Sequence, residues 1–187
     1  MTSELWMCRH GETEWSRDGR HTSTTDLELT AGGEEVATTL AERLAGTSFD
    51  LVLSSPRVRA RRTAELAGFD PEVEEDLVEW GYGDYEGIST NEIRETVPGW
   101  TVFTHPTPGG ETAEQVGARI DRVVARARDH GGRVLVFGHG HSLRVLAARW
   151  LEQDVRDGRH LKLDTATIST LGYERETPVL LRWNSDA

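Results

Sequence analysis

Short apolar strands alternate with amphipathic helices along this chain, and the alternation limits the folds open to it. The strands expected at 51–54 and 133–137 are almost wholly apolar, which is typical of strands inside a parallel sheet with both faces covered. Between them, residues 111–130 carry apolar side chains at helical spacing, and Gly131 and Gly132 end that helix. The pattern predicts an α/β fold, a three-layer αβα sandwich with a mostly parallel central sheet.

The remaining segments fit one domain over residues 1–187, a length that suits one buried core better than two. Further strands are expected at 4–9, 73–78, 167–173 and 179–183, and further helices at 30–46, from Pro56 onward and at 142–151. In the helix at 30–46, Thr30 is the expected N-cap, and Val36, Leu40 and Leu44 share the inner face. An irregular stretch at about 79–110, dense in Gly, Trp, Tyr and Pro, predicts a lid or cap rather than core.

Acidic residues outnumber basic ones by 32 to 21, which gives a formal net charge of −11. Broad binding of nucleic acid or of an anionic membrane needs a basic face, so we expect neither partner, and any phosphate bound must be small. The single Cys8, expected as a core residue, excludes an intramolecular disulfide, and no secretory signal pattern is seen. A cytoplasmic location is therefore expected, while the oligomeric state stays open, with a homodimer as one option.

Three strand ends carry polar residues suited to chemistry. Arg9-His10-Gly11 follows the first strand, residues 54–59 follow the second, and Gly138-His139-Gly140 follows the strand at 133–137. The carboxyl ends of parallel strands face one crevice, so these groups should converge. Imidazole can act as a nucleophile, guanidinium is a fixed fork for oxyanions, and glycine lets the backbone approach a ligand closely. The sequence therefore predicts a phosphate site around His10 and His139.

Four arginines crowd the start of the helix after Pro56, at positions 57, 59, 61 and 62. The N-terminus of a helix is the positive end of its dipole, so this arrangement favours a bound anion. At about 100° per residue, Arg59 and Arg62 share one face while Arg57 and Arg61 share another. We expect one pair to turn toward the crevice and Arg57 and Arg61 to be solvated.

Four short blocks stand out by their order and spacing. They are Arg9-His10-Gly11-Glu12-Thr13; Ser54-Ser55-Pro56 leading to Arg59-Ala60; Glu79 before Tyr82-Gly83 and Glu86-Gly87; and Gly138-His139-Gly140. Through these blocks the chain resembles the histidine phosphatase superfamily, in its phosphoglycerate-mutase-like branch, over nearly its whole length. The resemblance implies that fold and a phosphatase that needs neither metal nor cofactor.

By this resemblance, His10 is the nucleophile that becomes a phosphohistidine, and Glu79 is the general acid that protonates the leaving oxygen. Arg9, Arg59 and His139 would bind the phosphoryl oxygens, and a protonated His139 would help the two arginines to neutralise charge in the transition state. Spacing alone does not single out Glu79 among 32 acidic residues. Its role rests on the resemblance.

Two positions depart from the pattern of many relatives, which carry Asn and Gln where this chain has Ser16 and Thr22. Hydroxyls can still donate to an oxyanion, so both stay in the expected substrate-binding set with Gly140. The fuller pattern is most similar to a subgroup that includes acid phosphatases and sedoheptulose bisphosphatases. Mutases of this kind carry basic residues in an insertion, whereas residues 100–108 lack Arg and Lys. The expected substrates are small phosphomonoesters, such as sugar phosphates or bisphosphates.

Other functions remain open at this point. One is a phosphoglycerate-type phosphomutase, and another is a phosphate-binding module with little catalysis. A third would use His139 and His141 as a metal pair in a metallophosphatase. No role follows for His21, His105 or His141. The aromatic side chains of the 79–110 stretch could line the mouth of the site or pack in the core.

Overall fold

The computed structural model describes residues 3–186 and contains a six-stranded mixed sheet with the strand order β3-β2-β4-β1-β5-β6. Its strands are β1 (Glu4–Arg9), β2 (Leu51–Ser54), β3 (Glu72–Val73), β4 (Arg133–Gly138), β5 (Ile168–Glu174) and β6 (Thr177–Ser185). The first four run parallel, β5 runs antiparallel to β1, and β6 runs antiparallel to β5. The predicted α/β fold with a mostly parallel sheet is confirmed.

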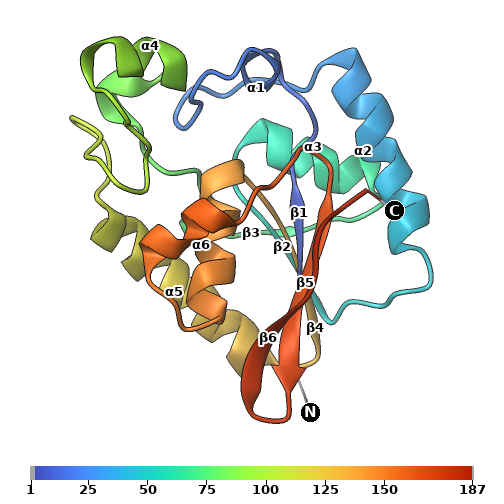
Figure 1. The fold of residues 1–187 in the computed structure, drawn as a ribbon. Helices are drawn as coiled ribbons and strands as arrows, with labels where there is room; N and C mark the ends of the chain where they lie inside the picture. Colours follow the sequence, from blue (N-terminus) through green and yellow to red (C-terminus); the bar gives the residue numbers. More distant parts are fainter. Residues whose placement is uncertain (1–2, 187) are drawn as a thin grey trace.

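Helices cover both faces of this sheet (Figure 1). The α-helices are α1 (Glu14–Arg17), α2 (Ala31–Leu44), α3 (Val58–Leu66), α4 (Thr90–Thr96), α5 (Ala113–His130) and α6 (Gly140–Trp150). The 3₁₀ turns are η1 (Glu75–Leu77), η2 (Gly83–Tyr85) and η3 (Val155–His160). Helices α5 and α6 pack on one face, and α2 and α3 lie on the other. None of the helices within residues 3–186 is long and apolar enough to span a membrane.

The apolar strand β4 explains the three layers. Successive side chains of a strand point to opposite faces. Val134 and Val136 belong to the hydrophobic cluster on the α5 and α6 side, whereas Leu135 and Phe137 belong to the cluster under α2 and α3. All four are fully buried, so both faces of the strand contribute to the core. Cys8 is a buried free thiol in the second cluster, as expected, and burial raises its pKa to about 12.

Several predicted boundaries need correction. Thr30 caps α2, as expected. Val36, however, is 49% exposed, and Ala37 lies in the core in its place. The buried face of α2 follows alternating spacings of four and three residues, which a constant spacing of four misses. Helix α3 begins at Val58, after Pro56, because the Asp26 carboxylate accepts a hydrogen bond from the Val58 amide.

Of the strand expected at 73–78, only Val73 lies in the sheet, as part of the two-residue strand β3 (Glu72–Val73). The Glu74 carboxylate accepts a hydrogen bond from the Asp76 amide, and this contact turns the chain into η1 before it reaches Glu79. The turn matters for the site because it sets the approach of the chain to Glu79.

The segment at 79–110 contains η2 and α4 and lies beside the carboxyl end of the sheet (Figure 1). Four of its aromatic side chains are buried in the larger hydrophobic cluster, Trp80, Tyr82, Trp100 and Phe103. Of the two options left open for these aromatic side chains, packing in the core is the one observed. The segment contributes Glu79, Tyr82 and Thr90 to the wall of the site as well as these side chains to the core, and its description as a lid or cap remains a prediction.

Candidate active site

A cavity of about 230 Å³ opens where β1 and β4 end. Its wall includes six residues predicted for the site, Arg9, His10, Ser16, Thr22, Glu79 and Gly140. It also includes Gly19, Arg20, His21, Tyr82, Thr90, His141, Arg144 and Leu163. The other two predicted residues, Arg59 and His139, are 0% and 1% exposed and do not line the cavity; the His139 ring contacts the His10 ring, and Arg59 is hydrogen-bonded to His139. The predicted convergence of the three strand ends is thus observed.

His10 is held as a neutral imidazole. Its main-chain amide donates to the Gly138 carbonyl at 3.0 Å, which joins the end of β1 to β4. Its Nδ1 lies 2.7 Å from the Gly11 carbonyl oxygen, and because a carbonyl only accepts, Nδ1 carries the proton and Nε2 keeps its lone pair. Burial, with the charges of Arg59 and Arg9, holds the pKa of His10 well below its usual value. Nε2 is therefore available as a nucleophile even in mild acid.

His139 is also neutral, which corrects the expectation of a protonated ring. Arg59 Nε donates to His139 Nδ1 at 3.2 Å, so Nδ1 is an acceptor and Nε2–H is left to donate to Ser55 Oγ at 2.7 Å. Burial, with Arg59 as the next cause, holds the pKa of His139 well below its usual value. The rings of His10 and His139 meet edge to face with centroids 5.2 Å apart.

Arg59 supplies buried positive charge to the site. Its two terminal nitrogens donate to the carbonyl oxygens of Thr25 and Thr22 at 3.2 and 3.1 Å, so the guanidinium also fixes the loop beside the cavity. Arg62 does not join it. Its Nε pairs with Glu34 at 2.7 Å on the surface, so of the expected pair only Arg59 turns toward the crevice.

Arg9 offers the clearest unused donor. Nη1 donates to the Leu163 carbonyl at 2.6 Å, whereas Nε is buried without a hydrogen-bond partner. A buried unpaired N–H is costly, and Arg9 is one of the residues that line the cavity with His10. Its guanidinium is therefore a candidate donor to an oxyanion bound beside His10. Gly140 makes room for this guanidinium, because a Cβ at Gly140 would lie 3.3 Å from Arg9 Cζ.

Gly11 serves packing rather than ligand approach, contrary to expectation. A Cβ at Gly11 would lie 2.7 Å from the carbonyl oxygen of Gly33 in the first turn of α2. The Gly11 amide also donates to Thr63 Oγ1 on α3 at 2.9 Å. Both contacts bring the loop after β1 against the helices beneath it, which holds the neighbouring His10 in place.

Glu79 is buried and caps helix α6 from another part of the chain. Oε1 accepts from the amides of Trp80 and Ser142 at 2.9 and 2.8 Å, and Oε2 accepts from the His141 amide at 3.0 Å. The N-cap residue of α6 is His139, whose side chain faces Arg59 and makes no capping bond. The carboxylate of Glu79 therefore satisfies amides that the helix leaves free.

Tyr82 and His141 form a neutral pair beside Glu79. The Tyr82 hydroxyl and His141 Nδ1 are 2.5 Å apart. Burial, followed by the charge of Glu79, raises the pKa of Tyr82 well above its usual value. Burial and the charge of Arg144 hold the pKa of His141 well below its usual value. His21 packs against Tyr82, and burial lowers its pKa to about 4.

The hydroxyls of Ser16 and Thr22 are already engaged in local hydrogen bonds. Ser16 and Thr22 line the cavity, but the Ser16 hydroxyl takes part in the capping box of α1, and the Thr22 hydroxyl donates to the Arg20 carbonyl at 3.2 Å. His105 lies on a separate cavity of about 320 Å³. Sequence reasoning missed Arg144, although it follows Gly140 by four residues on one helix, a spacing that places both on the same face.

The proposed metal pair is not supported by the ring contacts. Both nitrogens of His139 are taken by Arg59 and Ser55, and His141 Nδ1 faces Tyr82. A guanidinium beside His139 would also repel a cation. Within residues 3–186, no group of three or more His, Cys, Asp or Glu side chains is placed to hold a metal ion.

Known proteins match this chain along almost all of its length. Residues 5–186 match the model of the histidine phosphatase superfamily (branch 1). An acid phosphatase of Mycobacterium tuberculosis is 42% identical over 175 residues, covering 91% of this chain and 86% of the relative. A sedoheptulose 1,7-bisphosphatase of Saccharomyces cerevisiae is 34% identical over 184 residues, covering 80% of this chain and 68% of the relative.

A solved structure also matches the fold of this chain. The product of an open reading frame of Mycobacterium tuberculosis superposes with a TM-score of 0.94 at 40% identity, over 97% of both chains. The chain thus belongs to branch 1 of the histidine phosphatase superfamily and is a phosphoric monoester hydrolase.

Proposed function

We propose that this phosphatase hydrolyses small phosphomonoesters, chiefly sugar phosphates or sugar bisphosphates, through a covalent phosphohistidine on His10. The observation that carries the mechanism is the buried, neutral His10 whose protonated Nδ1 is bound to the Gly11 carbonyl. This contact leaves the Nε2 lone pair free on a cavity whose wall also holds Arg9. A nucleophile beside an unused guanidinium donor suits attack on a phosphoryl group.

In the first step His10 Nε2 bonds to phosphorus as the bond to the leaving oxygen breaks. Glu79, in its protonated form, gives its proton to that oxygen, and the Arg9 guanidinium donates to a phosphoryl oxygen. Arg59 and His139 act on His10 without lining the cavity, Arg59 through its charge and His139 through the ring contact. Water then attacks the phosphohistidine, returns a proton to Glu79 and releases phosphate.

The cavity supports a small, hydroxyl-bearing substrate. Tyr82, His141 and His21 are neutral at physiological pH and present hydrogen-bonding groups suited to sugar hydroxyls. Arg20 and Arg144 on the same wall offer positive charge for a second anionic group. The names of the two relatives, an acid phosphatase and a sedoheptulose bisphosphatase, agree with this class of substrate.

The test is to trap the intermediate. Wild-type protein mixed with a ³²P-labelled sugar phosphate and quenched in alkali should carry acid-labile, alkali-stable label, and His10→Ala should carry none and lose turnover. Activity should persist after treatment with a chelator. Label retained by His10→Ala, or activity lost on chelation and restored by a metal, would contradict the mechanism.

The same experiment addresses the mutase alternative. A mutase would pass the label to an added phosphate ester, whereas a hydrolase releases it as inorganic phosphate. A cytoplasmic location, the absence of nucleic-acid and membrane partners, and the homodimer option remain predictions.

A further inference from the structure

Three arginines of helix α5 bind the segment that leads to Glu79. They are Arg119, Arg122 and Arg126. They face residues 72–79 at spacings of three and four, so they share one side of the helix. The outer two make surface ion pairs, Arg122 with Asp76 at 2.6 Å and Arg126 with Glu72 and Glu74 at 2.6 Å each. Both arginines are open to solvent, which screens these pairs, so each pair contributes little. Arg119 is different because it is only 7% exposed.

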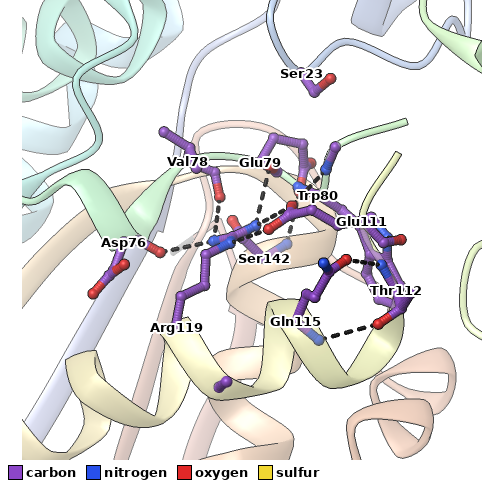
Figure 2. A network of polar contacts seen from close by, with 12 residues as sticks. Ser23, Asp76, Val78, Glu79, Trp80, Glu111, Thr112, Gln115, Arg119 and Ser142 are labelled. Carbon is purple, nitrogen blue, oxygen red and sulfur yellow. Dashed lines mark hydrogen bonds and ion pairs between the residues drawn. The ribbon is translucent and has the colours of Figure 1, made fainter. Parts of the chain in front are cut away.

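All five N–H donors of Arg119 are used (Figure 2). Nη1 donates to the carbonyl oxygens of Asp76 and Val78 at 2.7 and 2.8 Å, and Nη2 donates to that of Glu79 at 3.1 Å. Nε and Nη2 also donate to the two carboxylate oxygens of Glu111 at 2.8 and 2.9 Å. One guanidinium thus holds three main-chain carbonyls of the segment that ends at Glu79.

Glu111 holds the chain on the other side of Glu79. Its Oε2 accepts from the Gly81 amide at 2.7 Å, and its main-chain carbonyl accepts from Trp80 Nε1 at 3.0 Å. The pair Arg119–Glu111 therefore fixes the chain both before and after Glu79. Neither Arg119 nor Glu111 lines the catalytic cavity, so any effect of the pair on the substrate passes through Glu79.

We infer that Arg119 and Glu111 are positioning residues, whose ion pair holds the main chain at 76–81 so that the Glu79 carboxyl faces the cavity. The inference rests on the proposed acid role of Glu79. An ion pair whose arginine is buried is weak evidence for stability alone, because desolvation of the arginine offsets the attraction. Here four of the contacts go to the main chain beside one catalytic side chain, which ties the pair to the geometry of that side chain.

Removing the guanidinium should displace the acid more than the nucleophile. Without Arg119, three carbonyls and the Glu111 carboxylate lose donors, so the segment shifts to reach water or other donors. His10 is anchored by β1, β4 and the Gly11 carbonyl, which are independent of this pair. A misplaced acid slows departure of a poor leaving group, such as an alkoxide, and hardly affects a good one, such as a nitrophenolate.

The experiment measures single-turnover phosphohistidine formation with an alkyl phosphate, glycerol phosphate, and an aryl phosphate, p-nitrophenyl phosphate. The variants are Arg119→Met, Arg119→Lys, Glu111→Gln and Glu79→Gln. Arg122→Met is the matched control, since it removes a surface arginine that binds the same segment. Thermal unfolding of each variant is recorded alongside, and Arg119→Lys and Glu111→Gln carry the test if Arg119→Met does not fold.

We expect Arg119→Met to slow the alkyl reaction roughly 10- to 100-fold more than the aryl reaction, with Glu79→Gln at least as selective. Arg119→Lys, with three donors in place of five, should recover part of the loss. Arg122→Met should change both rates less than about twofold.

Equal slowing of both substrates by the Arg119 and Glu111 variants, while Glu79→Gln stays selective, would show a purely structural role and overturn the inference. If Glu79→Gln is itself unselective, the acid role of Glu79 fails and the inference fails with it.

Discussion

Glu79→Gln is expected to destabilise the fold as well as slow the reaction. The two carboxylate oxygens accept three main-chain N–H groups, from Trp80, His141 and Ser142. An amide has one oxygen and one NH₂ group. If the side-chain oxygen of the variant keeps the two hydrogen bonds that Oε1 accepts, its NH₂ group faces the main-chain N–H of His141. Both groups are donors, so that hydrogen bond is lost.

The magnitude follows from the contacts that are lost. A hydrogen bond to a charged group contributes about 1.5–3 kcal/mol, and a carboxylate at a helix N-terminus contributes about 0.3–1 kcal/mol more. Glu79 is buried, so solvent screens little of this. The free energy of unfolding should fall by about 2–4 kcal/mol, and the melting temperature by roughly 5–15 °C for a chain of this size.

Urea unfolding followed by tryptophan fluorescence measures this loss as a lower midpoint at an unchanged slope. Glu114→Gln is the matched control, since Glu114 also lies in the first turn of a helix, α5, but is exposed and pairs with Arg156 on the surface. It should change the free energy of unfolding by less than about 0.5 kcal/mol. Equal small changes in both variants would refute the role of Glu79 as a cap of α6.

Two further predictions concern the phosphate contacts and pH. Gly140→Ala would bring a Cβ to 3.3 Å from Arg9 Cζ, and it should weaken inhibition by vanadate about tenfold by shifting that guanidinium. Gly32→Ala, which meets no atom within 4 Å, should leave the inhibition constant unchanged, and equal constants for both variants would contradict the argument. His21 titrates at about 4 in the folded protein, below its usual value near 6.5, so the unfolded chain takes up the proton first as the pH falls. The contribution of neutral His21 to the free energy of unfolding is complete above about pH 6.5 and is lost as the pH falls toward 4. The free energy of unfolding should therefore fall by about 3 kcal/mol over this range, and urea midpoints should show the change. His21→Gln should flatten this part of the profile, and an unchanged profile would disprove it.

The sequence by itself determined the layers of the fold and the end of the sheet where the candidate site lies. Strand β4 could be predicted because its unbroken apolar run has no other stable environment than a sheet covered on both faces. Helix α5 followed from its amphipathic spacing and from the glycines that end it. His10 and His139 were brought together by topology alone, since parallel strands end at one edge.

The tertiary structure alone decided the protonation of His139 and the selection of Arg59 over Arg62. Both depend on contacts between residues far apart in the sequence, because Arg59 donates to His139 80 positions away while Arg62 meets Glu34 on the surface. Local pattern fixes which face of a helix a side chain occupies but not the partner it meets there. The contacts of Arg119 around Glu79 could not be predicted from the sequence for the same reason. Its five donors are satisfied by main-chain carbonyls and a carboxylate that only the folded chain brings within reach.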